Sequence, residues 1–237
     1  MSLIDETAEN RAAFCASIGA VFNDETVLRT AFTHRSYVNE HRGERIEHNE
    51  RLEFLGDAVL ELVVTRFLFD TYPDKTEGDL TAYRAALVNT NTISDAATRL
   101  GMNTCLLLSR GEARDTGRAR QFILANAFEA VIGALYLDQG YECAQAFVAA
   151  HIFPRAEEIV RRRLWQDNKS HFQEEAQERV SITPSYALIQ ERGPDHDKQF
   201  TVGVFLGEHL VAKGEGKSKQ EAEQAAARAA LDTKGWA

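Results

Sequence analysis

The chain has 237 residues, of which 44% are hydrophobic, and it carries a formal net charge of −9. This length suits one large domain or two of unequal size, and the composition is typical of a folded, largely helical protein. Apolar runs stay shorter than the roughly 18 residues of a membrane span, and the N-terminus lacks the features of a signal peptide, so we expect no membrane partner.

The cysteines are Cys15, Cys105 and Cys143, an odd number of residues spread far apart. They match neither a disulfide framework nor the ligand spacing of a zinc site. This usage predicts a reducing, cytoplasmic location.

The acidic charge balance, taken alone, argues against a nucleic-acid partner, because phosphate contacts need Lys or Arg. Both parts of the chain are acidic: residues 166–237 carry 9 Lys and Arg against 12 Asp and Glu, and residues 1–165 carry 18 against 24. Any RNA-binding surface must therefore be local. The candidate clusters are Arg110, Arg114, Arg118 and Arg120; Arg161, Arg162 and Arg163; and Lys213, Lys217 and Lys219.

Helical patterns dominate the first part of the chain. Residues 6–38 have the apolar spacing of helices, with a start for a second helix at Asn23-Asp24. The polar run from 40 to 48 predicts a loop. A longer helix then runs from Asn49 to about Phe69 and ends before Pro73.

The start of this long helix has two different faces. Glu50, Glu53 and Asp57 fall within about 60° of one another around the helix axis. The opposite side is apolar, with Leu52, Leu55 and Val59. Acids one turn apart repel, and a hard divalent cation such as Mg²⁺ between them would remove that repulsion. An ordinary solvated helix face has the same pattern, so the spacing alone leaves both interpretations open.

The consecutive residues from Asn49 to Ala58, Asn-Glu-Arg-Leu-Glu-Phe-Leu-Gly-Asp-Ala, resemble the signature of the ribonuclease III family. These are Mg²⁺-dependent nucleases that cut double-stranded RNA. By this resemblance Glu50, Glu53 and Asp57 correspond to acidic active-site positions. The stretch at residues 33–37 also resembles the sequence that precedes the signature helix, and we assign it no chemistry.

Two shorter helices are expected next, over residues 76–89 and 92–100. Glu77 lies in the first turn of the former, where a carboxylate suits the helix dipole, and that structural role is sufficient to explain it. The pair Glu77-Gly78 also resembles a Glu-Gly pair of the ribonuclease III family. The resemblance implies that Glu77 lies near the cleavage site.

A second functional helix is expected from Phe122 to Leu137, after a Gly- and Arg-containing loop over residues 109–120. Residues 123–130 resemble the second ribonuclease III motif, in which an Asp and a Glu three apart complete the metal site. Glu129 matches that Glu, but Asn126 stands where the family usually has Asp. On spacing alone, this pair is an ordinary polar helix face.

The pattern changes after a last helix, expected from about Cys143 to Leu164, and a short linker. A helix from Lys169 to Val180 is followed by three short strands and an Ala-rich helix. The strands are expected at residues 186–191, 200–206 and 209–213. Gly207-Glu208 suits a tight hairpin turn, and Ser218 and Glu221 are spaced as a capping box at the start of the last helix.

This α-β-β-β-α order resembles the double-stranded RNA-binding domain over residues 167–233. Such domains read the A-form shape, the phosphates and the 2′-hydroxyls of a duplex. The residues that the resemblance assigns to RNA contact are Gln173, Glu174, Gln177, His196, Lys217 and Lys219. Gln220 replaces a lysine common in that family, which weakens the expected phosphate clamp.

We therefore predict an α+β protein: an all-α ribonuclease III-like catalytic domain over residues 1–165, followed by an α-β-β-β-α double-stranded RNA-binding domain over residues 166–237. The predicted function is cleavage of double-stranded RNA by Mg²⁺-dependent phosphodiester hydrolysis, in RNA processing such as that of ribosomal RNA. The alternative is a double-stranded RNA-binding protein whose nuclease site is weakened or inert because Asn126 replaces the usual Asp.

The resemblance also implies a metal site and a homodimer. The expected catalytic residues are Asp57 and Glu129, and the expected metal ligands are Glu50, Glu53, Asp57, Asn126 and Glu129, with Mn²⁺ able to replace Mg²⁺. Each subunit of the homodimer would supply one acidic site, and each site would cut one strand. Phe54, an aromatic on the carboxylate side of the helix, is expected to enter a cavity of the partner subunit. Coverage by a loop of the same chain is the alternative.

Overall fold

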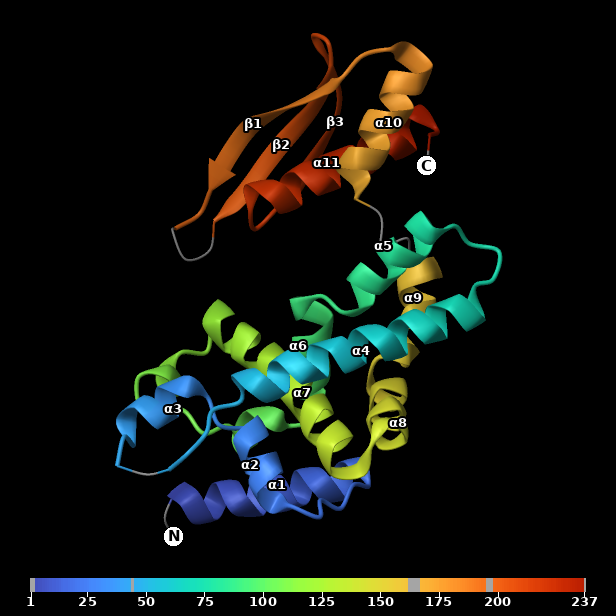
Figure 1. The fold of residues 1–237 in the computed structure, drawn as a ribbon. Helices are drawn as coiled ribbons and strands as arrows, with labels where there is room; N and C mark the ends of the chain where they lie inside the picture. Colours follow the sequence, from blue (N-terminus) through green and yellow to red (C-terminus); the bar gives the residue numbers. More distant parts are fainter. Residues whose placement is uncertain (1–2, 44, 162–166, 195–197, 237) are drawn as a thin grey trace. The chain divides into compact units, whose positions relative to one another are not determined.

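The computed structural model divides the chain into two compact units, residues 1–165 and 166–237 (Figure 1). The structure describes residues 3–43, 45–161, 167–194 and 198–236. The described part of the first unit is helical, apart from one isolated bridge between Thr33 and Leu107. The second unit combines two helices with a sheet, so the predicted α+β class is confirmed.

Capped helices build the first unit. The α-helices are α1 (Leu3–Ile18), α2 (Glu25–Ala31), α3 (Arg35–Glu40), α4 (Glu50–Thr71), α5 (Glu77–Leu87), α6 (Thr90–Arg99), α7 (Arg118–Gln139), α8 (Tyr141–His151) and α9 (Ala156–Arg161). Short 3₁₀ helices are η1 (Met102–Cys105), η2 (Glu112–Arg114) and η3 (Phe153–Arg155). Asp24 caps α2 by accepting from the Thr26 N–H at 2.8 Å, and Thr76 and Asp79 form a capping box at the start of α5.

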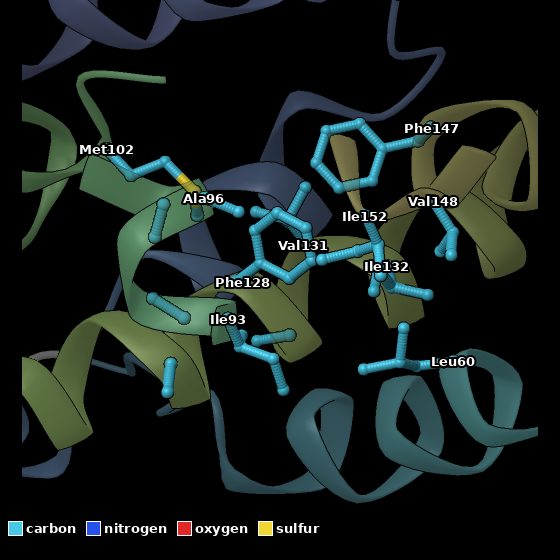
Figure 2. Close-up of a cluster of buried hydrophobic side chains, with 14 of the residues drawn as sticks. Leu60, Ile93, Ala96, Met102, Phe128, Val131, Ile132, Phe147, Val148 and Ile152 are labelled. Atoms are coloured by element: carbon cyan, nitrogen blue, oxygen red, sulfur yellow. The ribbon is translucent and has the colours of Figure 1, made fainter. Parts of the chain in front are cut away.

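Helices α4 and α7 lie at the centre of this unit, where they cross (Figure 1). Figure 2 shows part of the surrounding core, with Ile132 of α7 close to Leu60 of α4 and with Phe128 and Val131 on the side of α7 that faces away from α4. By length and composition α7 is the one described helix that also meets the criteria for a membrane span. Its most apolar window is 61% buried inside the unit, which is typical of a core helix.

The start of α7 differs from the prediction. The helix begins at Arg118, inside the segment 109–120 that we predicted as a loop. The guanidinium of Arg120 donates to the Asn103 side chain at 2.8 Å and to the Glu112 carbonyl. These tertiary contacts hold the first turn of α7 in place and have no signature in the local sequence.

The predicted helix over residues 143–164 is also wrong as a single element. Its described part is divided into α8, η3 and α9. Pro154 lies in the first turn of η3, and because proline has no N–H it cannot continue the hydrogen-bond ladder of α8. Residues 162–164 lie outside the described residues.

The second unit has the predicted order of elements. These are α10 (Asn168–Val180), β1 (Pro184–Arg192), β2 (Gln199–Leu206), β3 (His209–Gly216) and α11 (Lys219–Lys234). The strands form an antiparallel sheet in the order β1-β2-β3, and both helices pack on one face of it. The core between them contains Phe172 and Ala176 of α10, Val204 and Leu206 of β2, and alanines of α11.

The β2–β3 hairpin turn and one of the two hydrogen bonds of the predicted capping box are present in the second unit. Gly207, at φ +61°, closes the β2–β3 hairpin, and Ser218 accepts from the Glu221 N–H at 3.1 Å. The Glu221 carboxylate, however, accepts from the N–H of Lys217 at 2.9 Å rather than from that of Ser218. Only half of the predicted capping box therefore forms.

Candidate active site

Asn49 fixes the start of the acidic helix. Its side chain is buried and donates to the Ala31 carbonyl at 3.3 Å, while its backbone N–H donates to the Thr33 carbonyl at 2.9 Å. These bonds attach the start of α4 to the end of α2. The first two turns of α4, which carry Glu50, Glu53 and Asp57, therefore have a defined direction.

The backbones of α4 and α7 approach closely beside these acids. Gly56 and Gly133 are both buried, and a Cβ added to Gly56 would lie 1.7 Å from the carbonyl oxygen of Glu129. Neither position has room for a side chain. The crossing brings the predicted acids of α4 next to Asn126 and Glu129 of α7.

The carboxylates at this crossing share one electrostatic environment. The pKa of Glu129 is raised to about 8, mainly by burial and further by the charges of Asp57 and Glu53. Burial and the charge of Glu50 raise the pKa of Glu53, the nearby Asn126 amide lowers it, and the charge of Asp57 raises it further. The amide of Asn126 therefore favours the charged form of Glu53, while the neighbouring acids oppose it.

This donor set fits a hard divalent cation in its chemistry, because it offers carboxylate and amide oxygens with an excess of negative charge. Burial, followed by the charges of Asp57 and Glu53, raises the pKa of Glu129, and a bound cation would oppose this shift. Over the described ranges, no group of three or more His, Cys, Asp or Glu side chains is close enough to hold a metal ion.

Glu50 lies at the edge of the cluster. Its carboxylate is 3.4 Å from the Arg35 guanidinium and 3.8 Å from His48 Nδ1. The negative charge of Glu50 raises the pKa of Glu53. The structure thus gives Arg35, for which the sequence suggested no chemistry, a role as the ion-pair partner of Glu50.

Glu77 lies apart from the acids of its own chain. It is exposed at the start of α5, where it accepts from the Thr81 hydroxyl at 3.0 Å, and it lines a hollow of about 450 Å³ together with Thr65 and Phe69. Thr65 follows Asp57 on α4 by a rise of about 12 Å. The structure therefore does not bring Glu77 into the acidic cluster of the same chain.

Phe54 is 81% exposed, so nothing within the described part of the chain covers it. This contradicts the alternative in which a loop of the same chain buries it. Leu62 and Phe69, which are 56% and 68% exposed, continue an apolar row along α4. Phe54 also borders a hollow of about 700 Å³, whose other lining residues include Val27, Thr30, Leu55 and Leu137.

The predicted RNA-contact residues that the structure describes in the second unit are exposed. Gln173, Glu174 and Gln177 lie on α10, Lys217 precedes α11, and Lys219 begins it. His196 lies outside the described residues.

Two family models and several known proteins match the chain. A family model described as Ribonuclease-III-like matches residues 24–156, and one described as Double-stranded RNA binding motif matches residues 168–233. The chain belongs to the ribonuclease III family. The Ribonuclease 3 of Pelotomaculum thermopropionicum is 45% identical over 214 residues, which cover 90% of this chain and 89% of the relative. The Ribonuclease 3 of Bdellovibrio bacteriovorus is 41% identical over 227 residues, which cover 95% of this chain and 97% of the relative.

Among solved structures, the nuclease domain of ribonuclease III from Campylobacter jejuni is 38% identical, with a TM-score of 0.54. The match covers 60% of this chain and 94% of that domain, a flexible region of which is involved in its dimer formation. As a member of the ribonuclease III family that carries a duplex-binding motif, this chain is a divalent metal-dependent endoribonuclease for double-stranded RNA.

Sequence reasoning missed two kinds of residue in this ribonuclease III site. The contact of Asn49 with Ala31 is tertiary, although an Asn directly before an amphipathic helix is itself a helix-start signal. Gly56 and Gly133 did carry a signal. A glycine inside a helix costs about 1 kcal/mol relative to alanine, so one glycine in each of the two motif helices indicates close packing.

Proposed function

We propose that the enzyme hydrolyses phosphodiester bonds of double-stranded RNA with Mg²⁺ held by Glu53, Asp57 and Glu129, assisted by the Asn126 amide. The observation that supports this assignment most directly is the coupling of Glu129 with Asp57 and Glu53 in one partly buried, acidic environment. Mn²⁺ has the same preference for oxygen ligands and is expected to substitute.

The chain's residues have distinct roles in this proposal. When bound, the cation supplies charge that activates a water and stabilises the developing negative charge on the phosphate. The Glu129 carboxyl holds a proton at neutral pH in the metal-free protein, because its pKa is about 8, and it releases that proton when the site is filled. Asp57, which is exposed, faces the solvent from which a duplex approaches.

Asn126 is the only observation behind the binding-only alternative. Its amide removes one negative charge from the site, and charge count helps to determine how tightly a hard cation is held. Three carboxylates remain at the crossing, and the matched relatives are ribonucleases. We therefore propose an active nuclease whose metal affinity is reduced at this position.

The active form in this proposal is a homodimer. Phe54 is exposed beside a hollow of about 700 Å³ in its own chain, so a two-fold axis would place each Phe54 in the hollow of the other subunit. An exposed apolar row is typical of an interaction surface, and Leu62 and Phe69 extend it along α4. Glu77, remote from its own acidic cluster, could then act near a cleavage site only across the dimer.

In this proposal residues 1–165 cleave the RNA and residues 166–237 bind the duplex. Gln173, Glu174 and Gln177 on α10, His196, and Lys217 and Lys219 around the start of α11 form the duplex-binding surface. Phosphate binding is favoured there by the lysine charges and by the N-terminus of α11. Structured RNA in the cytoplasm, such as ribosomal RNA precursors, is the substrate class that fits.

The experiment that tests the site measures duplex binding and duplex cleavage separately for Asp57→Asn and Glu129→Gln. Both variants should bind a long RNA duplex as the wild type does, but cleave it at least about 100-fold more slowly, because they remove metal-holding charge. Glu142→Gln makes the same chemical change at an exposed residue of α8 and serves as the control. Cleavage at the wild-type rate by either site variant would contradict the assignment.

A further inference from the structure

Gly133 of α7 faces the backbone of α4 rather than a side chain. A Cβ at this position would lie 2.2 Å from the carbonyl oxygen of Leu52, 3.1 Å from the carbonyl carbon of Leu52 and 3.1 Å from the amide nitrogen of Gly56. All three atoms belong to the α4 main chain. No change of rotamer could make room for a methyl group.

A methyl group at Gly133 must therefore move a whole helix. Unstrained contacts between non-bonded heavy atoms lie near 3.5 Å, so α7 has to move away from α4 by about 1 Å. Both helices are rigid and anchored elsewhere: Asn49 attaches α4 to α2, and the side chain of Asp138 accepts from the backbone N–H groups of Asn23 and Asp24 near the end of α7.

The place of this contact along the two helices gives it a functional consequence. On α4, Leu52 directly precedes Glu53, and Gly56 directly precedes Asp57. On α7, Gly133 is one helical turn beyond Glu129, whose carbonyl faces Gly56 in the reciprocal contact. The close contact of the two helices therefore lies one residue before Glu53 and Asp57 on α4 and involves the backbone of Glu129 on α7.

We infer that Gly133 is a positioning residue of the metal site: because it lacks a side chain, it sets the α4–α7 separation at which the acids of the two helices serve one cation. The inference rests on the metal site proposed above. Mg²⁺ demands near-ideal ligand geometry at about 2.0–2.1 Å, so a 1 Å increase in the separation of its ligands is not tolerated. A glycine retained only for packing would affect the stability of the fold and leave metal affinity unchanged.

The test compares Gly133→Ala with Val131→Ala on the full-length protein. Val131 is two residues away on α7, about 160° around the helix from Gly133, and it is fully buried, so its truncation destabilises the fold without touching α4. The readout is the rise in thermal unfolding temperature as Mg²⁺ is added to chelator-treated protein without RNA, which reports binding to the folded state.

We expect both variants to unfold at a lower temperature than the wild type. The Mg²⁺ concentration for half-maximal stabilisation should rise at least about tenfold in Gly133→Ala and stay at the wild-type value in Val131→Ala. In cleavage assays, Gly133→Ala should lower kcat by about 100-fold at unchanged KM for duplex, since 1 Å misplacements at a reacting centre have this effect.

Equal Mg²⁺ dependence in Gly133→Ala and the wild type, or an equal loss of Mg²⁺ affinity in both variants, would overturn the inference. If Gly133→Ala does not fold, the titration is repeated with trimethylamine N-oxide, which strengthens burial. A variant that stays unfolded even then would assign Gly133 to folding and also overturn the inference. Two other outcomes would instead refute the proposed metal site. One is that Mg²⁺ does not raise the unfolding temperature of the wild type, and the other is that Mg²⁺ raises that of Glu129→Gln as much as that of the wild type.

Discussion

The side-chain amide of Asn126 on α7 lies close to the Glu53 carboxylate on α4 and lowers its pKa. This effect of the amide opposes the effects of burial and of the neighbouring Glu50 charge, which raise the pKa of Glu53. An Asp at the same position would add charge to the cluster instead of a donor. The residue that departs from the family motif thus favours the charged form of Glu53, but it offers a cation one negative charge fewer than Asp would.

Replacing Asn126 by Asp is therefore expected to improve the enzyme and to weaken the metal-free fold. The added carboxylate should lower the Mg²⁺ concentration for half-maximal cleavage by at least about tenfold. Duplex binding without metal should change little, because it depends mainly on the second unit. A Mg²⁺ titration of duplex cleavage checks this prediction. Identical curves for both forms would show that Asn126 does not limit metal binding.

The metal-free protein should become less stable as the pH rises from about 4.5 to about 8. Glu129 has a pKa of about 8 in the fold against a usual 4.5, so the folded state binds more protons across this window. The stabilisation from the Glu129 carboxyl is complete at pH values below its pKa in the unfolded chain. It is lost as the pH rises through its pKa in the folded protein. With chelator present, the Glu129 carboxyl should make the unfolding temperature fall between pH 5 and pH 8.5. His34 and His151, whose pKa values are lowered by burial, oppose this fall at the acidic end of the range.

The variant Glu129→Gln isolates this effect because it removes the titrating group. Its unfolding temperature should depend less on pH than that of the wild type, with a smaller dependence left from Glu53, whose pKa is also raised. The control Glu142→Gln should keep the wild-type dependence. The assignment to Glu129 fails if its variant and the wild type lose stability equally with pH.

The sequence was most informative where local pattern and chemistry agree. The acids and apolar residues at the start of α4 indicated both the helix and its two faces, and Gly207 indicated the β2–β3 hairpin. Asn126 and Glu129 were placed on one helix face by their spacing alone. In each case the signal lies within a few residues of the feature it predicts.

Other features depend on contacts between distant parts of the chain. The ion pair of Glu50 with Arg35 spans 15 positions in sequence, and the first turn of α7 is held by contacts of Arg120 with Asn103 and Glu112. The pKa of Glu129 results from burial by the whole domain. Spacing on one helix cannot predict such quantities, because the partner atoms belong to other elements.

The variant Phe54→Ala should shift the protein from dimer towards monomer. An aromatic anchor buried in a partner contributes at least about 1 kcal/mol, and a symmetric dimer has two, so association should weaken at least about 30-fold. Val21→Ala provides the matched control, since Val21 is also 81% exposed but does not line the hollow beside Phe54. Sedimentation velocity measures both. A dimer as stable as the wild type in Phe54→Ala would contradict the proposed interface.

Lys217→Ala and Lys219→Ala should weaken duplex binding and reduce its dependence on salt. Each phosphate contact that is lost should make the slope of log affinity against log salt concentration shallower by about 1. Lys234→Ala removes an exposed lysine from the opposite end of α11, where it stacks on Trp236, and should leave the slope unchanged. Duplex affinity measured in metal-free buffer at several salt concentrations gives the slope for each variant. Equal slopes for all three variants would place the phosphate contacts elsewhere.

The most direct test of the account is the addition of Mg²⁺ to chelator-treated protein that is already bound to a long RNA duplex. We predict that the duplex stays intact without the cation and that both of its strands are cut once Mg²⁺ is added. Glu129→Gln should bind the same duplex and leave it uncut at the same Mg²⁺ concentration. A wild-type protein that binds the duplex and leaves it intact at every Mg²⁺ concentration would contradict the account.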